Sequence, residues 1–163
     1  MRGAGALFAL AAIVPASVSA EQGRRISMHH ATGTFEIVMT PESQAPAEGD
    51  GLPTSRVGLL KTFAGPVTGT ARGTMLAAGT PAPGKPAAYV AVDQFSGTVD
   101  GHSGGFVLLH RGTMSATGNA ELSIIIAPDS GTGDLAGIAG TLAIEIKGGK
   151  HLYDLTYSLP DRP

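Results

Sequence analysis

"PDSGTGDLAGIAG" (residues 128–140) places four glycines beside small polar residues, a composition that superficially fits a phosphate-binding loop. Such a loop directs backbone N–H groups at the anion from the start of a helix. Here the strand-like SIIIA precedes the stretch and the strand-like TLAIEIK follows it. The Gly-Lys-Ser/Thr ending of the motif is also missing from the sequence. The glycines therefore indicate turns and close approach of strands in an all-β fold.

Short runs rich in β-branched and aromatic residues recur along the chain, separated by Gly, Pro, Asn and Asp, and predict eight strands. They cover residues 31–40, 55–63, 67–77, 87–98, 104–113, 120–127, 139–147 and 150–159. Because most connections are short, neighbouring strands are expected to be antiparallel. The sequence predicts a single closed antiparallel eight-stranded β-barrel with short Gly-rich turns, which leaves no edge to aggregate. A β-sandwich is the alternative.

The first twenty residues have the pattern of a secretory signal peptide. Arg2 precedes an apolar stretch over 6–14, and Val18-Ser19-Ala20 predicts cleavage before Glu21. The apolar stretch is shorter than the roughly 20 residues that cross a bilayer. A retained N-terminal anchor is the alternative. Residues 21–163 are expected to form one exported barrel domain, periplasmic or extracellular, with no membrane span after cleavage.

Composition excludes several classes of function. The chain has 13 acidic and 11 basic residues, and cleavage would remove Arg2, so a net negative charge opposes nucleic-acid binding. The chain has no cysteine, which excludes thiolate chemistry. No metal or cofactor is expected, because the five histidines (His29, His30, His102, His110 and His151) lack the spacing of a metal site. The sequence leaves the oligomeric state open.

The fourth and fifth runs predict a hairpin that brings a carboxylate to an imidazole. If it closes symmetrically on Asp100–Ser103, Asp93 faces His110 and Phe95 faces Leu108, all on one side of the sheet. A carboxylate that orients an imidazole on an apolar face is the arrangement of a general base. Asp93 and His110 are therefore the candidate catalytic residues. A structural or solvated ion pair is the alternative.

Other side chains are candidates for lining a ligand cavity, because a barrel of about eight strands can hold one small molecule. Lys61, within LLKTF, is a cation inside an apolar run, although such a side chain often extends to water. The candidate ligand-binding residues are Lys61, Tyr89, Phe95, Phe106, Leu108 and Tyr153.

Several stretches together resemble a bacterial family called domain of unknown function 3224. They are ATGTFEI (31–37), GLLKTFAGPVTGTARGTML (58–76), AYVAVDQFSGTVDGHSGGFVLLHRGTM (88–114), IIIAPDSGTGDLAGIAGTLAIEI (124–146) and GKHLYDLTYSLP (149–160). The resemblance implies an allene-oxide-cyclase-like barrel. It matches His110 to the family's HxGTM block and places Asp93 where the family usually has Glu. Pro66 and His102 depart from the family pattern.

Two functions follow as expectations. The first is binding of a small apolar or amphipathic ligand in the barrel lumen. The second is a cyclase or isomerase for a reactive lipid-like or polyketide-like substrate, with Asp93 and His110 as acid/base groups. The similar plant barrels, which steer cyclisation of a fatty-acid epoxide, suggest the second. A filled barrel with a structural or partner-binding role is the remaining alternative.

Overall fold

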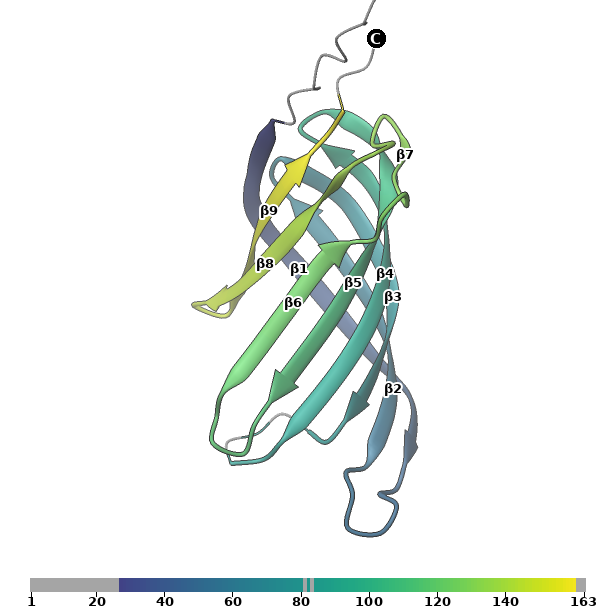
Figure 1. Cartoon of the computed structure of the whole chain (residues 1–163), viewed down its shortest axis with the longest axis vertical. Helices are drawn as coiled ribbons and strands as arrows, with labels where there is room; N and C mark the ends of the chain where they lie inside the picture. The colour runs from purple at the N-terminus through teal and green to yellow at the C-terminus, as the bar shows by residue number, and fades with distance from the viewer. Residues whose placement is uncertain (1–26, 81, 83, 161–163) are drawn as a thin grey trace, which may run out of the picture.

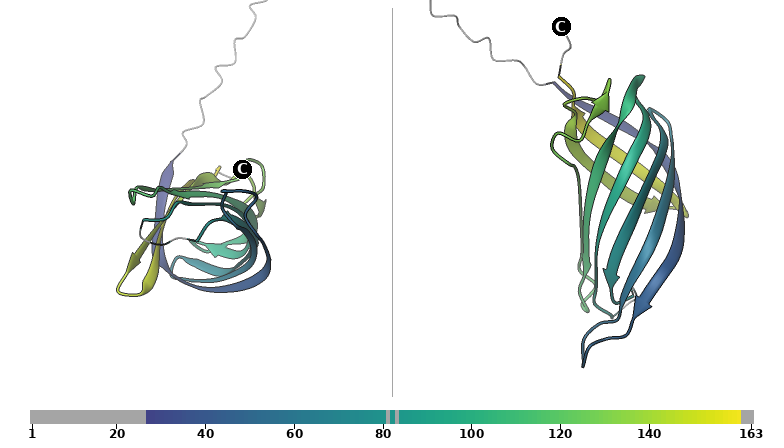
Figure 2. Two further views of the ribbon diagram at one scale, coloured as in Figure 1. Left: turned by 90° about the horizontal axis from the view of Figure 1, so that it is seen from below. Right: turned by 90° about the vertical axis from the view of Figure 1, so that its right-hand side faces the viewer.

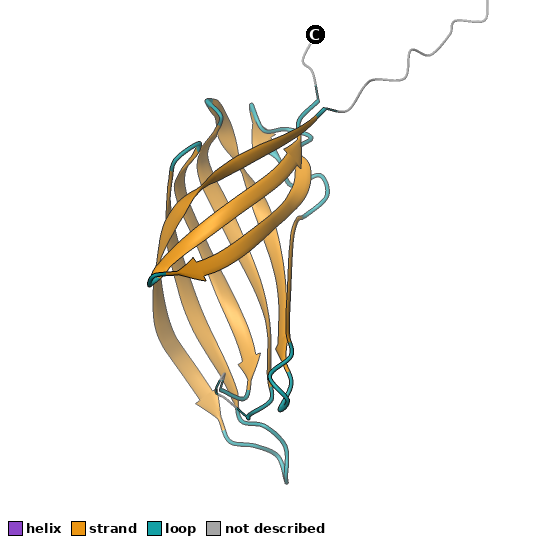
Figure 3. Cartoon of the chain, turned by 90° about the vertical axis from the view of Figure 1, so that its left-hand side faces the viewer, coloured by secondary structure: helices purple, strands orange, loops and turns teal. Residues whose placement is uncertain are grey.

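A computed structural model describes residues 27–80, 82 and 84–160 of the chain, and these form nine strands and no helix (Figures 1 and 3). No helix in this part of the chain is therefore available to cross a membrane. The predicted signal peptide lies outside the described residues. The strands are β1 (Met28–Ala45), β2 (Thr54–Ala64), β3 (Val67–Ala78), β4 (Ala87–Val99), β5 (His102–Met114), β6 (Ala120–Ile126), β7 (Thr132–Gly133), β8 (Ala139–Lys147) and β9 (Lys150–Ser158).

The strands close into an antiparallel β-barrel, which confirms the predicted fold. The eight long strands follow the order β4-β3-β2-β1-β9-β8-β6-β5, and pairing of β4 with β5 closes the ring. Figure 2 shows the ring from below. The two-residue strand β7 adds to the edge of β5. Large apolar side chains alternate along most strands, which places one face of each strand in the interior.

Closure of the barrel is uneven along its axis. We call the end near β7 the capped end and the opposite end, with the β1–β2 connection, the far end (Figure 1). The β1 strand has 18 residues, whereas β8 and β9 have nine each and turn back part-way down the barrel. Among the described residues, β1 pairs with β9 only as far as Phe35, and β6 pairs with β8 only at Ile125. The far half is therefore open along one side.

The glycine-rich stretch 128–140 closes the capped end. Leu135 and Ile138 are fully buried and belong to the aromatic core below them. Polar groups of the same stretch bond the edge of β5: the Gly105 N–H donates to Thr132 Oγ1, and the Val107 N–H donates to Ser130 Oγ. Beyond the end of β6, this segment therefore lies beside β5 in the place of a neighbouring strand. It also seals the interior at the capped end.

The predicted register of the β4–β5 hairpin is wrong by two residues. Asp93 lies opposite Leu108, His110 lies opposite Ala91, and Phe95 lies opposite Phe106. The reason is the turn, because Asp100 and Gly101 alone form the connection, with φ of 47° and 83°. Two positive φ values are typical of a two-residue type I′ hairpin, whose twist matches that of the strands. The shift is even, so the predicted residues keep the same face.

Replacing the apolar plug of the capped end should destabilise the barrel. Leu135→Ala is expected to lower the free energy of unfolding by about 2–5 kcal/mol, because it removes a buried side chain and leaves a cavity. The measurement is urea unfolding, with Val90→Ala on the exposed outer face as the control. A loss below about 1 kcal/mol for Leu135→Ala would show that the segment does not contribute to the core.

Candidate functional site

A buried cluster of three ionisable side chains lies between the two halves of the barrel. Lys61 comes from β2, Asp93 from β4 and His110 from β5, and all three are on the inward face. The aromatic core that includes Phe63 and Phe95 packs on the capped side. On the far side lies a smaller apolar cluster of Val57, Leu59 and Ala91, with Ile37, Met75 and Tyr89 packed against it. The charged cluster therefore marks the boundary between the two cores.

Asp93 Oδ2 is the centre of the cluster. It accepts a hydrogen bond from the Lys61 ammonium and lies 3.1 Å from His110 Nε2. The side chains of Lys61, Asp93 and His110 are only 5%, 0% and 4% exposed. Despite the short distance, the His110–Asp93 contact is not a well-directed hydrogen bond, and Asp93 Oδ1 has no hydrogen-bond partner among the described residues. The arrangement is an ion pair with an adjoining imidazole, in which some polar atoms, such as Asp93 Oδ1, form no hydrogen bond with the described residues.

The protonation of Asp93 follows from opposing effects. Burial by itself raises the pKa of the carboxyl group, but the contacts with His110 and the charge of Lys61 outweigh it, so the pKa is lowered below 3.8. Asp93 is therefore a carboxylate at neutral pH. Burial, followed by the charge of Asp93, raises the pKa of the Tyr89 hydroxyl. Tyr89 thus belongs to the electrostatic surroundings of the cluster and stays protonated.

The Lys61–Asp93 contact crosses an intervening strand. β3 lies between β2 and β4, and its inward residues at this level are Ala71 opposite Lys61 and Gly73 opposite Asp93. A Cβ atom on Gly73 would lie 2.0 Å from Asp93 Oδ1, so only glycine leaves room for this carboxylate. Sequence reasoning missed both Lys61 as the partner of Asp93 and the role of Gly73. The pair of small residues on the inward face of β3 was the sequence signal that could have indicated a contact across this strand.

The other predicted ligand-binding residues do not gather at one site. Phe95, Phe106, Leu108 and Tyr153 are buried in the packed core of the capped half. Tyr153 serves the fold there, since its hydroxyl accepts a hydrogen bond from the Val67 N–H at 3.0 Å. Lys61 belongs to the charged cluster, and Tyr89 alone reaches a hollow at the far end.

That hollow, of about 610 Å³, lies at the rim of the far end. Its lining takes three consecutive residues from each of β1 to β5, so it includes side chains of both faces of the wall. The inward residues are Gln44, Ser55, Ala77, Tyr89 and Gly112, and the flanking outward ones include Arg56, Leu76, Val90 and Arg111. Apolar groups thus dominate the lining, with a guanidinium at each side.

A second hollow, of about 530 Å³, lies where β1 leaves β9. It is lined by Thr34, Phe35, Glu36 and Ile37 of β1 and by Gly149, Lys150 and His151 of the β8–β9 hairpin. The His151 ring packs against that of Phe35, with centroids 5.0 Å apart. This hollow therefore opens on the incompletely closed side of the barrel.

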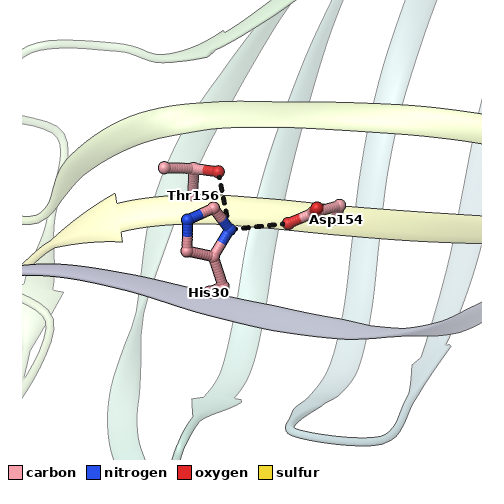
Figure 4. Close-up of polar contacts among 3 residues, drawn as sticks. All are labelled: His30, Asp154 and Thr156. Atoms are coloured by element: carbon pink, nitrogen blue, oxygen red, sulfur yellow. Dashed lines mark hydrogen bonds and ion pairs between the residues drawn. The ribbon is translucent and has the colours of Figure 1, made fainter.

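Another histidine–carboxylate pair lies on the outer surface (Figure 4). His30 Nδ1 is 3.3 Å from Asp154 Oδ1 and 3.2 Å from Thr156 Oγ1. Both members of the pair are about half exposed, so water screens their interaction. Across the residues that the structure describes, no three His, Asp or Glu side chains are grouped to hold a metal ion.

Comparison with known proteins agrees with the fold. The family model described as "Protein of unknown function (DUF3224)" matches residues 31–157, which include every member of the buried cluster. The chain belongs to the DUF3224 family. One solved structure, of a DUF3224 protein of unknown function from Shewanella oneidensis MR-1, is 36% identical. It covers 83% of this chain and 100% of its own, with a TM-score of 0.75. No curated protein matches the chain.

Removal of the cation from the buried cluster should destabilise the fold. Lys61→Met leaves Asp93 buried without a counter-charge and is expected to cost about 3–5 kcal/mol in urea unfolding. The double variant Lys61→Met/Asp93→Leu should recover most of that loss, since it removes both charges. Equal stability of the single and double variants would contradict the proposed pairing.

Acid should weaken the fold through Asp93. Its pKa is lower in the folded protein than the ordinary 3.8. The carboxylate therefore contributes stability above the unfolded pKa, and this contribution is lost as pH falls through the folded pKa. Between about pH 5 and 2, unfolding free energy should decline less steeply in Asp93→Asn than in the original protein. Parallel pH profiles of the two proteins would contradict this expectation.

Proposed function

We propose that this protein is an exported barrel that binds a small apolar or amphipathic molecule in its far half. The observation that carries the proposal is a set of apolar side chains that are on the inward face and yet exposed. Met39 on β1 is 51% exposed and Leu122 on β6 is 46% exposed. In the register, Met39 lies opposite buried Leu59, and Leu122 lies opposite buried Gly112, which fixes both as inward-facing.

The contrast between the two halves supports this location. In the capped half, aromatic rings such as Phe35, Phe63 and Phe95 pack against one another and fill the interior. In the far half, the inward residues near the rim are small on β2, β3 and β5, at Ser55, Ala77 and Gly112. Exposed apolar area beside such space favours a ligand that removes it from water.

The export part of the proposal rests on the sequence of residues 1–20 alone. Mass spectrometry of the mature protein from its own cells tests it, with an N-terminus at Glu21 as the expected result. A chain that still begins at Met1 would contradict cleavage.

A pair of variants on one strand tests the binding site. Leu122 points inward and Ile125 points outward, and they are similarly exposed, at 46% and 40%. Binding of the neutral fluorescent probe N-phenyl-1-naphthylamine should weaken about tenfold in Leu122→Gln, because a polar group then faces the ligand. Ile125→Gln should bind like the original protein. Absence of binding to the original protein, or equal loss in both variants, would contradict the proposal.

A second candidate function is a cyclase or isomerase. The observation that favours it is the inward contact of His110 Nε2 with Asp93 Oδ2 at 3.1 Å, since an imidazole beside a carboxylate can exchange a proton with a bound substrate. The spare Asp93 Oδ1 atom is a further acceptor. Because the cluster is almost fully buried, a substrate would reach it from the far side, past Tyr89.

Conversion of an aliphatic allylic epoxide tests this second function. The original protein should accelerate cyclisation or isomerisation of the epoxide, and His110→Gln should lose that acceleration by about 10²-fold or more. The His30→Gln variant, which alters the exposed pair, is the matched control. Equal rates with the original protein and with buffer would contradict an enzymatic role toward this class of substrate.

A further inference from the structure

We infer that the outer wall formed by β3 to β6 is an interface between two copies of this chain, which pair side by side about a two-fold axis. Aliphatic side chains that point outward from this wall carry the inference. Their exposed fractions lie between 36% and 54%, and they are Leu76, Val90, Val92, Leu109 and Ile125. The interface is on the outside of the barrel, so it is independent of the ligand binding proposed for the interior.

These side chains form one continuous surface, which we call the apolar stripe. Leu76 on β3 lies opposite Val90 on β4. Two residues further along β4, Val92 lies opposite Leu109, which in turn lies opposite Ile125 on β6. Side chains in such cross-strand positions contact one another. Because the strands are inclined to the barrel axis (Figure 1), the stepped stripe runs along the barrel, where a convex wall can meet a second barrel.

The wall around the stripe differs in composition from the rest of the outer surface. The outward residues of β4 include no charged side chain and are Ala88, Val90, Val92, Gln94, Ser96 and Thr98. On the opposite side of the barrel, the outward residues of β8 and β9 include Glu145, Lys147, Lys150 and Asp154. Charge depletion at the centre of an exposed apolar surface is typical of a protein–protein interface.

The charges at the two borders of the stripe favour a second copy as the partner. On the β3 border, Arg72 is exposed and has no ion-pair partner among the described residues. On the β6 border, Glu121 is 74% exposed and lies 3.6 Å from Arg111. A two-fold axis along the stripe places the β3 border of each copy against the β6 border of the other. Arg72 of each copy then faces Glu121 of the other, whereas an anionic membrane would favour basic residues at both borders.

The wall is large enough for a specific but weak pair. The 13 residues of β4 extend about 43 Å, and β3 to β6 are about 14 Å across. The wall is thus roughly 500 Å² in flat projection, close to the roughly 800 Å² of accessible surface that each partner contributes to a standard interface. Because two convex barrels meet along a stripe, we expect a dissociation constant of about 10 μM, so that the protein is largely monomeric below about 1 μM.

Analytical ultracentrifugation of the purified mature protein tests the interface. Between about 1 and 200 μM, the original protein should change from monomer to dimer. Val92→Arg should weaken association at least about tenfold, because it places two like charges near the two-fold axis. Val38→Arg is the matched control, since Val38 points outward from β1, is 59% exposed and is outside the stripe. Neither valine lines a hollow, so both variants should retain ligand binding.

Mixing two charge variants tests the two-fold pairing. Arg72→Glu and Glu121→Arg should each weaken self-association about tenfold, since each places like charges across the interface. An equimolar mixture should recover association as a mixed dimer, because positions 72 and 121 then carry opposite charges at both contacts. Failure of the mixture to recover would overturn the two-fold pairing.

Other results would overturn the interface itself. These are a monomeric original protein at about 200 μM, and equal weakening of association by Val92→Arg and Val38→Arg. A separate arm measures cosedimentation with vesicles of anionic phospholipid. A monomeric protein that binds these vesicles, and loses that binding only in Val92→Arg, would assign the stripe to a membrane surface instead.

Discussion

The short length of β8 and β9 is the constraint on which the rest of this barrel depends. A strand advances about 3.3 Å per residue, so these nine-residue strands span roughly half the length of the 18-residue β1. All eight strands can therefore meet only in the capped half. There the interior closes tightly and fills with aromatic side chains. In the far half the wall is incomplete, and inward residues such as Met39 remain in contact with water.

The buried charges lie where one half changes into the other. An isolated carboxylate would be unfavourable at this depth, and Lys61 offsets that cost only because Ala71 and Gly73 let it reach across β3. The cluster thus depends on small residues that carry no chemistry themselves. It also divides the apolar interior into a filled part and a part with room for an occupant. Ligand binding and proton transfer are both proposed for this second part.

Local patterns in the sequence were sufficient for much of the fold. Runs rich in β-branched and aromatic residues, such as 139–147, predicted strands, and the short connections between them predicted antiparallel neighbours. The β4–β5 register was missed because Asp100 and Gly101 alone complete the turn. The cluster was predicted in part, since Asp93 and His110 share a face of adjacent strands. Lys61 could not be paired with Asp93, because strand pairing rules describe neighbours and β3 lies between them.

The sequence by itself determined the all-β class, the approximate strands, the common face of Asp93 and His110, and the role of residues 128–140 as turn-forming rather than phosphate-binding. Each of these follows from properties that act over a few residues, such as alternation and the conformational freedom of glycine. Only the tertiary structure decided which half is filled, where the barrel stays open and which cation meets Asp93. These depend on relative strand lengths and on contacts across a whole strand, which no short stretch of the chain encodes.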